Sequence, residues 1–287
     1  MTQTIRLALV AIALCSISVY AQTTLLQENF DAGVLPDGWT QQTLASDGGW
    51  LAGESTDLES QWWPIAPHGN MMATNDDGCD CDKSEDYLIT PALDLSGVES
   101  AILAFSSYYD GGSYEGDDEV ATVEYSLDGG STWTLLQTLE GSEGTWDFEV
   151  IDLDVVLGEA EVHLGFRYND GGGWLYGWAI DDVTVLEPSG LDLALIGLDS
   201  EGVVLAPATE DLAGTVVNLG TDTVYSYTVT WSMEGASGET TIDGLTLGTA
   251  ESHSFSFNEV LPFDWSGNYN VTAEITAVNG GSDDQAL

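Results

Sequence analysis

The stretch ATVEYSLDGG, residues 121–130, decides the fold class of this chain. Its apolar or aromatic side chains at 121, 123, 125 and 127 alternate with the polar Thr122, Glu124 and Ser126. A period of two is that of a β-strand with one buried face. Asp128-Gly129-Gly130 follows at once, and this tripeptide is a turn signal. We therefore expect a strand that ends in a tight turn.

The same pattern recurs along the chain, whereas helical periodicity is nearly absent after the first residues. Residues 160–168 alternate in the same way, and the run SAILAFSSYY, 100–109, is apolar on both faces. A strand that is apolar on both faces belongs at the centre of a sandwich. Further Asp-Gly-Gly turns lie at 47–49, 110–112 and 170–172. Short strands separated by such turns indicate a β-sandwich.

A break at Glu187-Pro188-Ser189-Gly190 separates two such regions. After it, alternating strands appear again at 225–233 and 269–277. A segment of about 100 residues with about seven short strands fits an immunoglobulin-like sandwich. We predict two all-β domains, 22–188 and 190–287, joined by a short linker.

The first 21 residues have the organisation of a secretory signal peptide. Arg6 precedes an apolar run, Leu7 to Ile17, which is too short to span a membrane. Val19-Tyr20-Ala21 offers small or apolar residues for cleavage after Ala21. We expect a secreted protein, extracellular or at the cell surface, without membrane insertion.

The charge of the chain is extreme: 49 acidic residues stand against 3 lysines and arginines, a net charge of −46. Without clustered cations, nucleic acid and anionic membrane surfaces are excluded as partners. Dissolved salt or bound divalent cations must offset the repulsion between these carboxylates. The composition is compatible with adaptation to salt, with calcium binding, or with both.

Cys79 and Cys81 are the cysteines that remain after the leader. An oxidising compartment permits a disulfide between them, although a single intervening residue constrains its geometry. Free thiols are the other interpretation, and zinc comes third because further cysteine or histidine ligands at suitable spacing are missing.

Four stretches in order give the first domain a family resemblance: ENFDAGVLPDGWT (28–40), DYLITPALDLSG (86–97), ATVEYSLDGGSTWTLL (121–136) and FRYNDGGGWLYGWAIDDVTV (166–185). They resemble the cleaved-adhesin or choice-of-anchor domains of secreted Bacteroidetes proteins, which are MAM-like. The resemblance implies a jelly-roll β-sandwich, structural calcium, and adhesion or substrate binding. GTVVNLGTDTV (214–224) and VTAEITAVNGGSDD (271–284) resemble adhesion-related immunoglobulin-like domains.

Residues 126–133, SLDGGSTW, match the Asp-box pattern S-x-D-x-G-x-T-W. Asp128 can accept hydrogen bonds from the turn, the glycines allow positive φ, and Trp133 packs beneath. Asp-boxes recur in sialidase propellers, but a propeller needs repeated blades and this chain has one copy. We predict a structural hairpin.

The sequence contains no nucleophile elbow, and we assign no catalytic residue. His163 lies on the polar face of a strand, and His253 is in register with Phe255 and Phe257. His68, in the loop PHGN, is the histidine that could serve a site. With so many acids, some carboxylate pair will have glycosidase spacing by chance.

Calcium is the metal that the acidic clusters favour, because it takes six to eight oxygen ligands. We predict two groups of ligands. Glu28 and Asp31 near the first strand are joined by Asp181 and Asp182 of the last, which alternation places on opposite faces. The resemblance implies that these two strands lie side by side. The second group is the acidic loop 75–82, with Asp76 and Asp77. Solvated turns in an acidic protein are the alternative interpretation.

Aromatic residues gather in or next to loops, where they can stack on sugar rings or form binding hot spots. The candidates for ligand contact are Trp62, Trp63, Tyr114, Trp174 and Tyr176. Packing beneath the loops is the alternative for each of them.

These observations predict a calcium-stabilised adhesion or binding module that recognises an extracellular glycan or protein and has no catalytic site. A hydrolase, glycosidase or peptidase, or an accessory domain of one, is the first alternative and would need a deep pocket with a perturbed acid or histidine. A purely structural spacer is the second.

Overall fold

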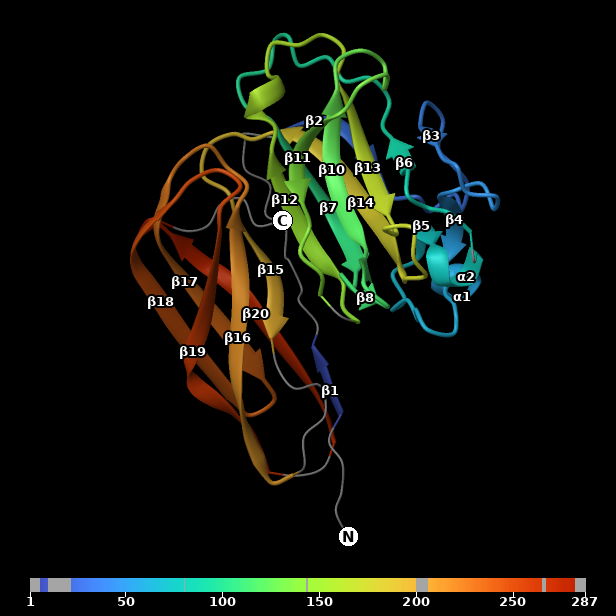
Figure 1. Cartoon of the computed structure of the whole chain (residues 1–287). Coiled ribbons are helices and arrows are strands. Elements are labelled where there is room, and N and C mark those ends of the chain that lie inside the picture. The colour runs from blue at the N-terminus through green and yellow to red at the C-terminus, as the bar shows by residue number, and fades with distance from the viewer. Residues whose placement is uncertain are drawn as a thin grey trace. The chain divides into compact units, whose positions relative to one another are not determined.

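A computed structural model of the chain describes residues 6–9, 22–79, 81–142, 144–199, 206–264 and 267–281 (Figure 1). Two compact units divide it: Thr23–Glu187, and the described residues of 188–287 together with 6–9 and 22. Among the described residues, no helix is long and apolar enough to cross a membrane. The predicted leader lies outside the described residues except for β1 (Arg6–Leu9), which pairs in parallel with β20.

The first unit is built from two main antiparallel sheets. One has the order β11-β10-β13-β6-β3: Thr134–Thr138, Val120–Ser126, His163–Asn169, Asp86–Ile89 and Thr40–Gln42. The other has the order β12-β7-β14-β5-β4, with β2 also paired to β14: Asp147–Asp152, Ile102–Tyr109, Gly177–Glu187, Asn70–Asn75, Leu51–Glu54 and Thr23–Glu28. A small hairpin, β8 (Ser113–Tyr114) and β9 (Asp117–Asp118), and three single-turn helices complete the unit: α1 (Ser55–Leu58), α2 (Asp76–Cys79) and η1 (Asp154–Val156).

The core of this unit lies between the two sheets and explains the run of apolar residues at 100–109. Every residue of β7 is buried: Leu103 and Phe105 belong to the core between the sheets, whereas Tyr108 packs in a second apolar cluster with Trp63 and Ile65. Phe105 meets Phe166 of the opposite sheet edge to face at 5.1 Å. Trp178 of β14 is fully buried and donates its indole N–H to Ser107 Oγ at 3.0 Å. Burial of such aromatic side chains dominates core energetics.

The Asp-box forms the hairpin that the sequence predicts. Residues 127–133 connect β10 to β11, and Asp128 Oδ1 accepts the backbone N–H of Thr132 at 2.8 Å. Trp133 stacks on Tyr87 with ring centroids 5.0 Å apart. The motif therefore has a complete structural explanation in this fold.

The second unit has two sheets around a core of its own. The first has the order β15-β16-β19: Leu193–Asp199, Ala208–Asn218 and Ser252–Phe263. The second has the order β1-β20-β17-β18, where β20 is Asn268–Val278, β17 is Val224–Met233 and β18 is Ala236–Leu247. The alternation at 225–233 is seen in Tyr227, Val229 and Trp231, which are all buried. The predicted all-β class, a jelly-roll sandwich followed by an immunoglobulin-like sandwich, is confirmed.

Candidate functional site

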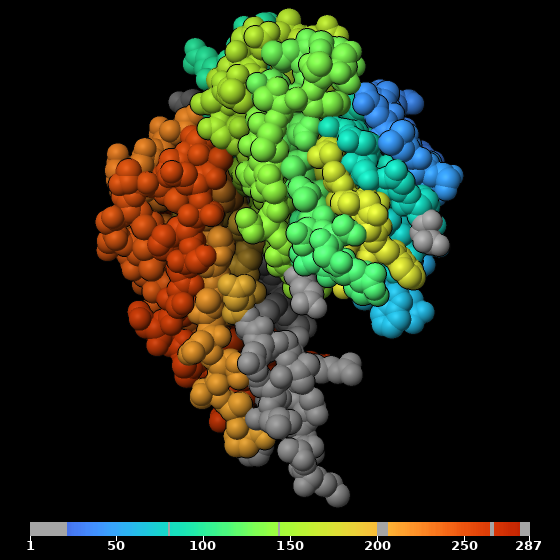
Figure 2. Space-filling view, viewed as in Figure 1, coloured from blue at the N-terminus to red at the C-terminus, as the bar shows by residue number. Residues whose placement is uncertain are grey.

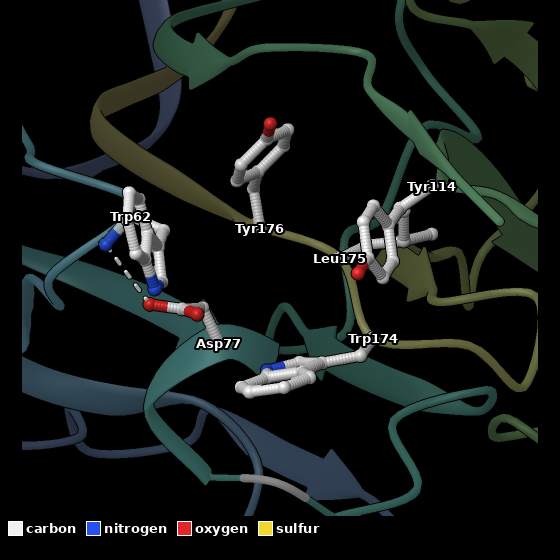
Figure 3. A pocket seen from close by; sticks show the side chains of 6 residues that line it. All are labelled: Trp62, Asp77, Tyr114, Trp174, Leu175 and Tyr176. Atoms are coloured by element: carbon white, nitrogen blue, oxygen red, sulfur yellow. Dashed lines mark hydrogen bonds between the residues drawn. The ribbon is translucent and has the colours of Figure 1, made fainter.

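An aromatic pocket of about 370 Å³ lies on the first unit, where four separate segments of the chain meet. We call it the aromatic pocket and define it by its lining: Trp62, Asp77, Tyr114, Trp174, Leu175 and Tyr176. Trp62, Tyr114 and Trp174 are 65%, 53% and 52% exposed, which is unusual for such large side chains. In Figure 3, Trp62 and Tyr114 stand on opposite sides of a common space, and Trp174 and Tyr176 face each other across it. The structure thus brings together four of the five aromatic residues predicted to contact a ligand.

These residues come from segments far apart in the sequence. Trp62 follows α1, Asp77 lies in α2, Tyr114 in β8, and Trp174 in the loop between β13 and β14. Figure 2 shows the yellow segment that leads into β14 exposed between the green β8 region and the blue-to-cyan segment around α1 and α2. Exposed loops held on a rigid sandwich are where binding residues tend to gather.

Hydrogen bonds to buried or anchored acids hold these loops in place. Asp77 Oδ2 accepts the backbone N–H of Trp62 at 3.2 Å, and this bond is drawn in Figure 3. Asp76 Oδ2 accepts the N–H of Leu175 at 2.6 Å. Glu119, which is buried, accepts the N–H of Tyr176 at 3.2 Å. These bonds hold the backbone at Trp62, Leu175 and Tyr176 without a ligand, which lowers the entropy cost of ordering these segments on binding.

The two buried acids that hold the pocket backbone, Asp76 and Glu119, have raised pKa values. Burial raises the pKa of Asp76 to about 7, with the negative charge of Asp170 acting in the same direction and the N–H of Leu175 opposing it. Burial likewise raises the pKa of Glu119, against hydrogen bonds from Gly112, Tyr168 and Tyr176. Desolvation is the dominant cause in both, since each side chain is removed from water.

Trp63 was predicted to contact a ligand, and this prediction is wrong. Its side chain is 0% exposed and packs against Tyr108 with ring centroids 6.0 Å apart. A Cβ at Gly177 would lie 2.8 Å from the Trp63 ring, so the indole rests on the backbone of β14. Trp62 and Trp63 are neighbours in sequence, but one lines the pocket and the other belongs to the core.

A buried lysine follows the acidic loop 75–82 and pairs with acids outside that loop. Lys83 is 0% exposed, and its Nζ lies 3.0 Å from Asp47 Oδ2 and 3.3 Å from Asp86 Oδ2. Its backbone N–H donates to Asp170 Oδ2 at 2.8 Å. A buried charge needs such partners, because isolated ions pay a large desolvation penalty. Sequence reasoning missed this cluster; its signal was one lysine within a run of acidic residues.

Asp76 and Asp77, predicted as calcium ligands, hold different backbone segments in this structure, Leu175 and Trp62 respectively. Within the described ranges, two groups of three side chains have ligand atoms within 4.8 Å of one another: Asp47 with Cys79 and Cys81, and His68 with Asp181 and Asp182. Neither includes Asp76 or Asp77. Cys79 and Cys81 form a disulfide, one of the alternatives left open by the sequence, so their sulfur atoms are not thiolate ligands.

The second group contains His68, Asp181 and Asp182 but neither Glu28 nor Asp31, the other two predicted ligands, and Glu28 Oε1 accepts the backbone N–H of Phe30 at 3.0 Å. We call these five residues together the strand-end cluster. β2 pairs with β14 so that Glu28 lies opposite Val183. The first and last strands are therefore neighbours, as the resemblance implied. Asp181 is buried and its Oδ2 lies 3.0 Å from His68 Nδ1, whereas the exposed Asp182 has its Oδ2 4.0 Å from the same nitrogen.

The prediction that Asp181 and Asp182 face opposite sides of the strand is wrong. The register of β14 against β7 shifts between Asp181 and Thr184, and Asp182 has a φ of +52°. A bulge of this kind interrupts the period of two and re-aims side chains. Carboxylate oxygens of both residues consequently reach the same imidazole.

Electrostatics within the strand-end cluster favour protons or a cation. The hydrogen bond to Asp181 is the main cause of a raised pKa at His68, and the charges of Asp181 and Asp182 add to it. Burial raises the pKa of Asp182, and the negative charges of Asp181 and Asp31 raise it further. His68 was the histidine that sequence analysis considered for a site. By contrast, His163 bonds Thr90 O and His253 bonds the Tyr227 hydroxyl.

Comparison with known proteins gave matches among solved structures. No family model matches the sequence. No curated protein matches it. The K1 cleaved adhesin domain of Lys-gingipain from Porphyromonas gingivalis is 21% identical, with a TM-score of 0.40 over 57% of this chain and 97% of that domain. The K3 domain of the same protein is 19% identical, with a TM-score of 0.43 over 57% and 98%.

A xylan-binding CBM22 domain from Paenibacillus barcinonensis is 13% identical, with a TM-score of 0.37 over 60% of this chain and 100% of that domain. Cleaved adhesin domains, the family that the sequence resembles, are thus among the solved structures to which this chain is similar.

Proposed function

We propose that this chain is a secreted binding module that recognises an extracellular glycan or protein through the aromatic pocket. The observation that carries the proposal is the grouping of four aromatic side chains from three separate segments of the chain around one space, with a carboxylate at its side. Exposed aromatic faces stack on sugars and serve as hot spots for protein segments. Asp77 can accept hydrogen bonds from ligand hydroxyl or N–H groups.

Binding is favoured over hydrolysis by the carboxylates of the pocket. Glycoside hydrolysis uses two carboxyl groups on either side of the scissile bond. Among the described residues that line the aromatic pocket, Asp77 is the one that carries a carboxylate, so a second carboxyl group is missing from this lining. The neighbouring Asp76 is buried, with its Oδ2 on the N–H of Leu175, and so it supports the wall of the pocket.

We further propose that calcium binds the strand-end cluster and stabilises the first unit. Glu28, Asp31, Asp181 and Asp182 supply the carboxylate oxygens that this hard cation prefers. A bound calcium would neutralise the mutually repelling carboxylates and tie β2 to the bulge of β14. His68 competes with the ion for Asp181 Oδ2, since Nδ1 already lies 3.0 Å from that atom. Binding of calcium to Oδ2 would therefore weaken the interaction of this oxygen with His68.

The two tryptophans that line the aromatic pocket allow a controlled test of the proposed function. Purified protein without the leader is applied to glycan and matrix-protein arrays, as wild type, Trp62→Ala, Trp174→Ala and Tyr225→Ala. Tyr225 is 57% exposed and lies in the second unit, which makes it the control. We expect the two pocket variants to lose the signal with unchanged unfolding temperature, and the control to keep it.

Two results would overturn the proposal. One is binding that survives Trp62→Ala and Trp174→Ala combined. The other is turnover of glycosidase or peptidase substrates above a heat-denatured control, because the module is proposed to have no catalytic site.

A further inference from the structure

The four rings of the aromatic pocket surround a space rather than form a flat platform. In Figure 3, Trp62, Tyr114, Trp174 and Tyr176 are distributed around that space, with Asp77 beside Trp62. The negative faces of aromatic rings attract cations, and rings that enclose a group on several sides are suited to an alkylated ammonium ion. Building on the proposed function, we propose that the group recognised in this pocket is an organic ammonium ion.

Charge around the pocket supports a cation and opposes an anion. Asp77 lines the pocket, and the Asp117 carboxylate lies next to the loop before Trp174, since a Cβ at Gly173 would be 2.9 Å from Asp117 Oδ2. A net charge of −46 adds a long-range field of the same sign. An ammonium ligand gains from these charges, whereas a sulfated or carboxylated ligand would be repelled.

The basic residues of the described chain leave no cation free to bind an anionic ligand here. Lys83 is fully buried between Asp47 and Asp86. Arg167 lies 3.5 Å from Glu85 Oε1 and 4.0 Å from Glu124 Oε1, over the ring of Tyr87. The remaining one of the 3, Arg6, belongs to the predicted leader. Recognition of phosphate, sulfate or carboxylate normally depends on such side chains.

The volume of the aromatic pocket and the hydrogen bonds that hold its backbone fit an alkylated ammonium group together with the first atoms of the chain that carries it. A volume of about 370 Å³ is at the lower end of the range for small-molecule sites. The Asp77–Trp62 and Glu119–Tyr176 hydrogen bonds hold two of the rings through their backbone. A preformed set of rings can desolvate the cation without reorganising, and cation–π attraction is strongest for desolvated cations.

Charge and shape can be separated with a pair of probes. Choline carries a trimethylammonium group, and 3,3-dimethylbutan-1-ol is its uncharged counterpart of the same shape. Binding is measured by tryptophan fluorescence, since Trp62 and Trp174 line the pocket. We expect choline to bind at least about tenfold more tightly than the neutral alcohol. This ratio corresponds to the free energy of a desolvated cation–π contact together with the attraction of one carboxylate. Trp174→Ala and Asp77→Asn should each weaken choline at least about threefold, and Tyr225→Ala should leave it unchanged.

Further arms distinguish the source of the ammonium group. A peptide with trimethyl-lysine represents a protein ligand, a chitosan oligomer represents an amino sugar, and choline represents a free metabolite. Equal binding of choline and the neutral alcohol, or choline binding that survives Trp62→Ala and Trp174→Ala combined, overturns the inference. If xylohexaose or chitohexaose binds in the pocket while none of the ammonium probes does, the inference fails and the proposed function stands. If array binding is independent of the pocket residues, the proposed function itself fails.

Discussion

Replacing Lys83 with methionine tests the contribution of its ion pairs with Asp47 and Asp86 to the stability of the first unit. The lysine is fully buried, and its Nζ contacts Asp47 and Asp86. Methionine has a similar length and fills the same space, but it removes the positive charge. Asp86 is 0% exposed and would keep only its hydroxyl partners, Thr43 and Thr74.

The magnitude follows from the burial of the two acids. Removing one partner from a buried ion pair costs about 3–5 kcal/mol, because the other charge stays uncompensated. Asp47 is 25% exposed and adds less, since water screens it. We therefore expect the lower part of this range, about 3 kcal/mol. For a unit of this size that is roughly 6–12 °C in unfolding temperature.

Differential scanning calorimetry at pH 7 measures this difference, with and without a chelator. The double variant Lys83→Met/Asp86→Asn is the control and should recover part of the loss, because no buried carboxylate is left unpaired. The chelator should lower the unfolding temperature of wild type and Lys83→Met equally, since the lysine and the strand-end cluster are independent. A Lys83→Met variant within about 0.5 kcal/mol of wild type would refute the role of the lysine.

Three further predictions concern the same fold. Calcium at a hundredfold excess over Kd should stabilise the first unit by about 2.7 kcal/mol, and Asp182→Ala should reduce this gain; identical melts with and without chelator would contradict the strand-end site. Burial raises the pKa of Glu149 from 4.5 to about 7, so its contribution to stability is complete below pH 4.5 and is lost as the pH rises through 7. Glu149→Gln should therefore flatten the dependence of unfolding temperature on pH between 5 and 8. An unchanged slope in this variant would contradict the prediction. Trp63→Ala should cost about 3–5 kcal/mol of unfolding free energy while Trp62→Ala costs little, and equal effects on stability in chemical denaturation would contradict the division between core and pocket.

The fold could be predicted from the sequence because its strands are regular over most of their length. Residues 121–126 lie in a regular strand, and β7 is apolar on both faces because its side chains pack into two different apolar clusters. The hairpin at Asp128 depends on neighbouring residues, and these are visible in the sequence. Local patterns of this kind carry most of the information on fold class.

The candidate site was less predictable because it depends on register and on distant contacts. Nothing in the pair Trp62-Trp63 distinguishes the exposed ring from the buried one. The bulge after Asp181 reverses the expected orientation of the next residue, and strand periodicity cannot anticipate a bulge. Glu119 supports Tyr176 from 57 residues away in sequence, a contact visible only in the folded chain.

The charge imbalance concealed the role of the lysine. The 49 acids against 3 bases direct attention to metal ions, yet two of the acids, Asp47 and Asp86, are paired with the buried Lys83. Buried ion pairs depend on tertiary structure, which composition does not describe.

The indole N–H signals of the tryptophans, measured by two-dimensional NMR, test the central claim most directly. Trp62 and Trp174 line the aromatic pocket, whereas Trp178 and Trp231 are buried in the two cores. On titration with xylohexaose, chitohexaose, a chitosan oligomer and choline in turn, we predict that at least one probe shifts the Trp62 and Trp174 signals and leaves those of Trp178 and Trp231 in place. Binding established on the arrays that leaves the Trp62 and Trp174 signals unmoved would contradict the assignment of the aromatic pocket as the ligand site.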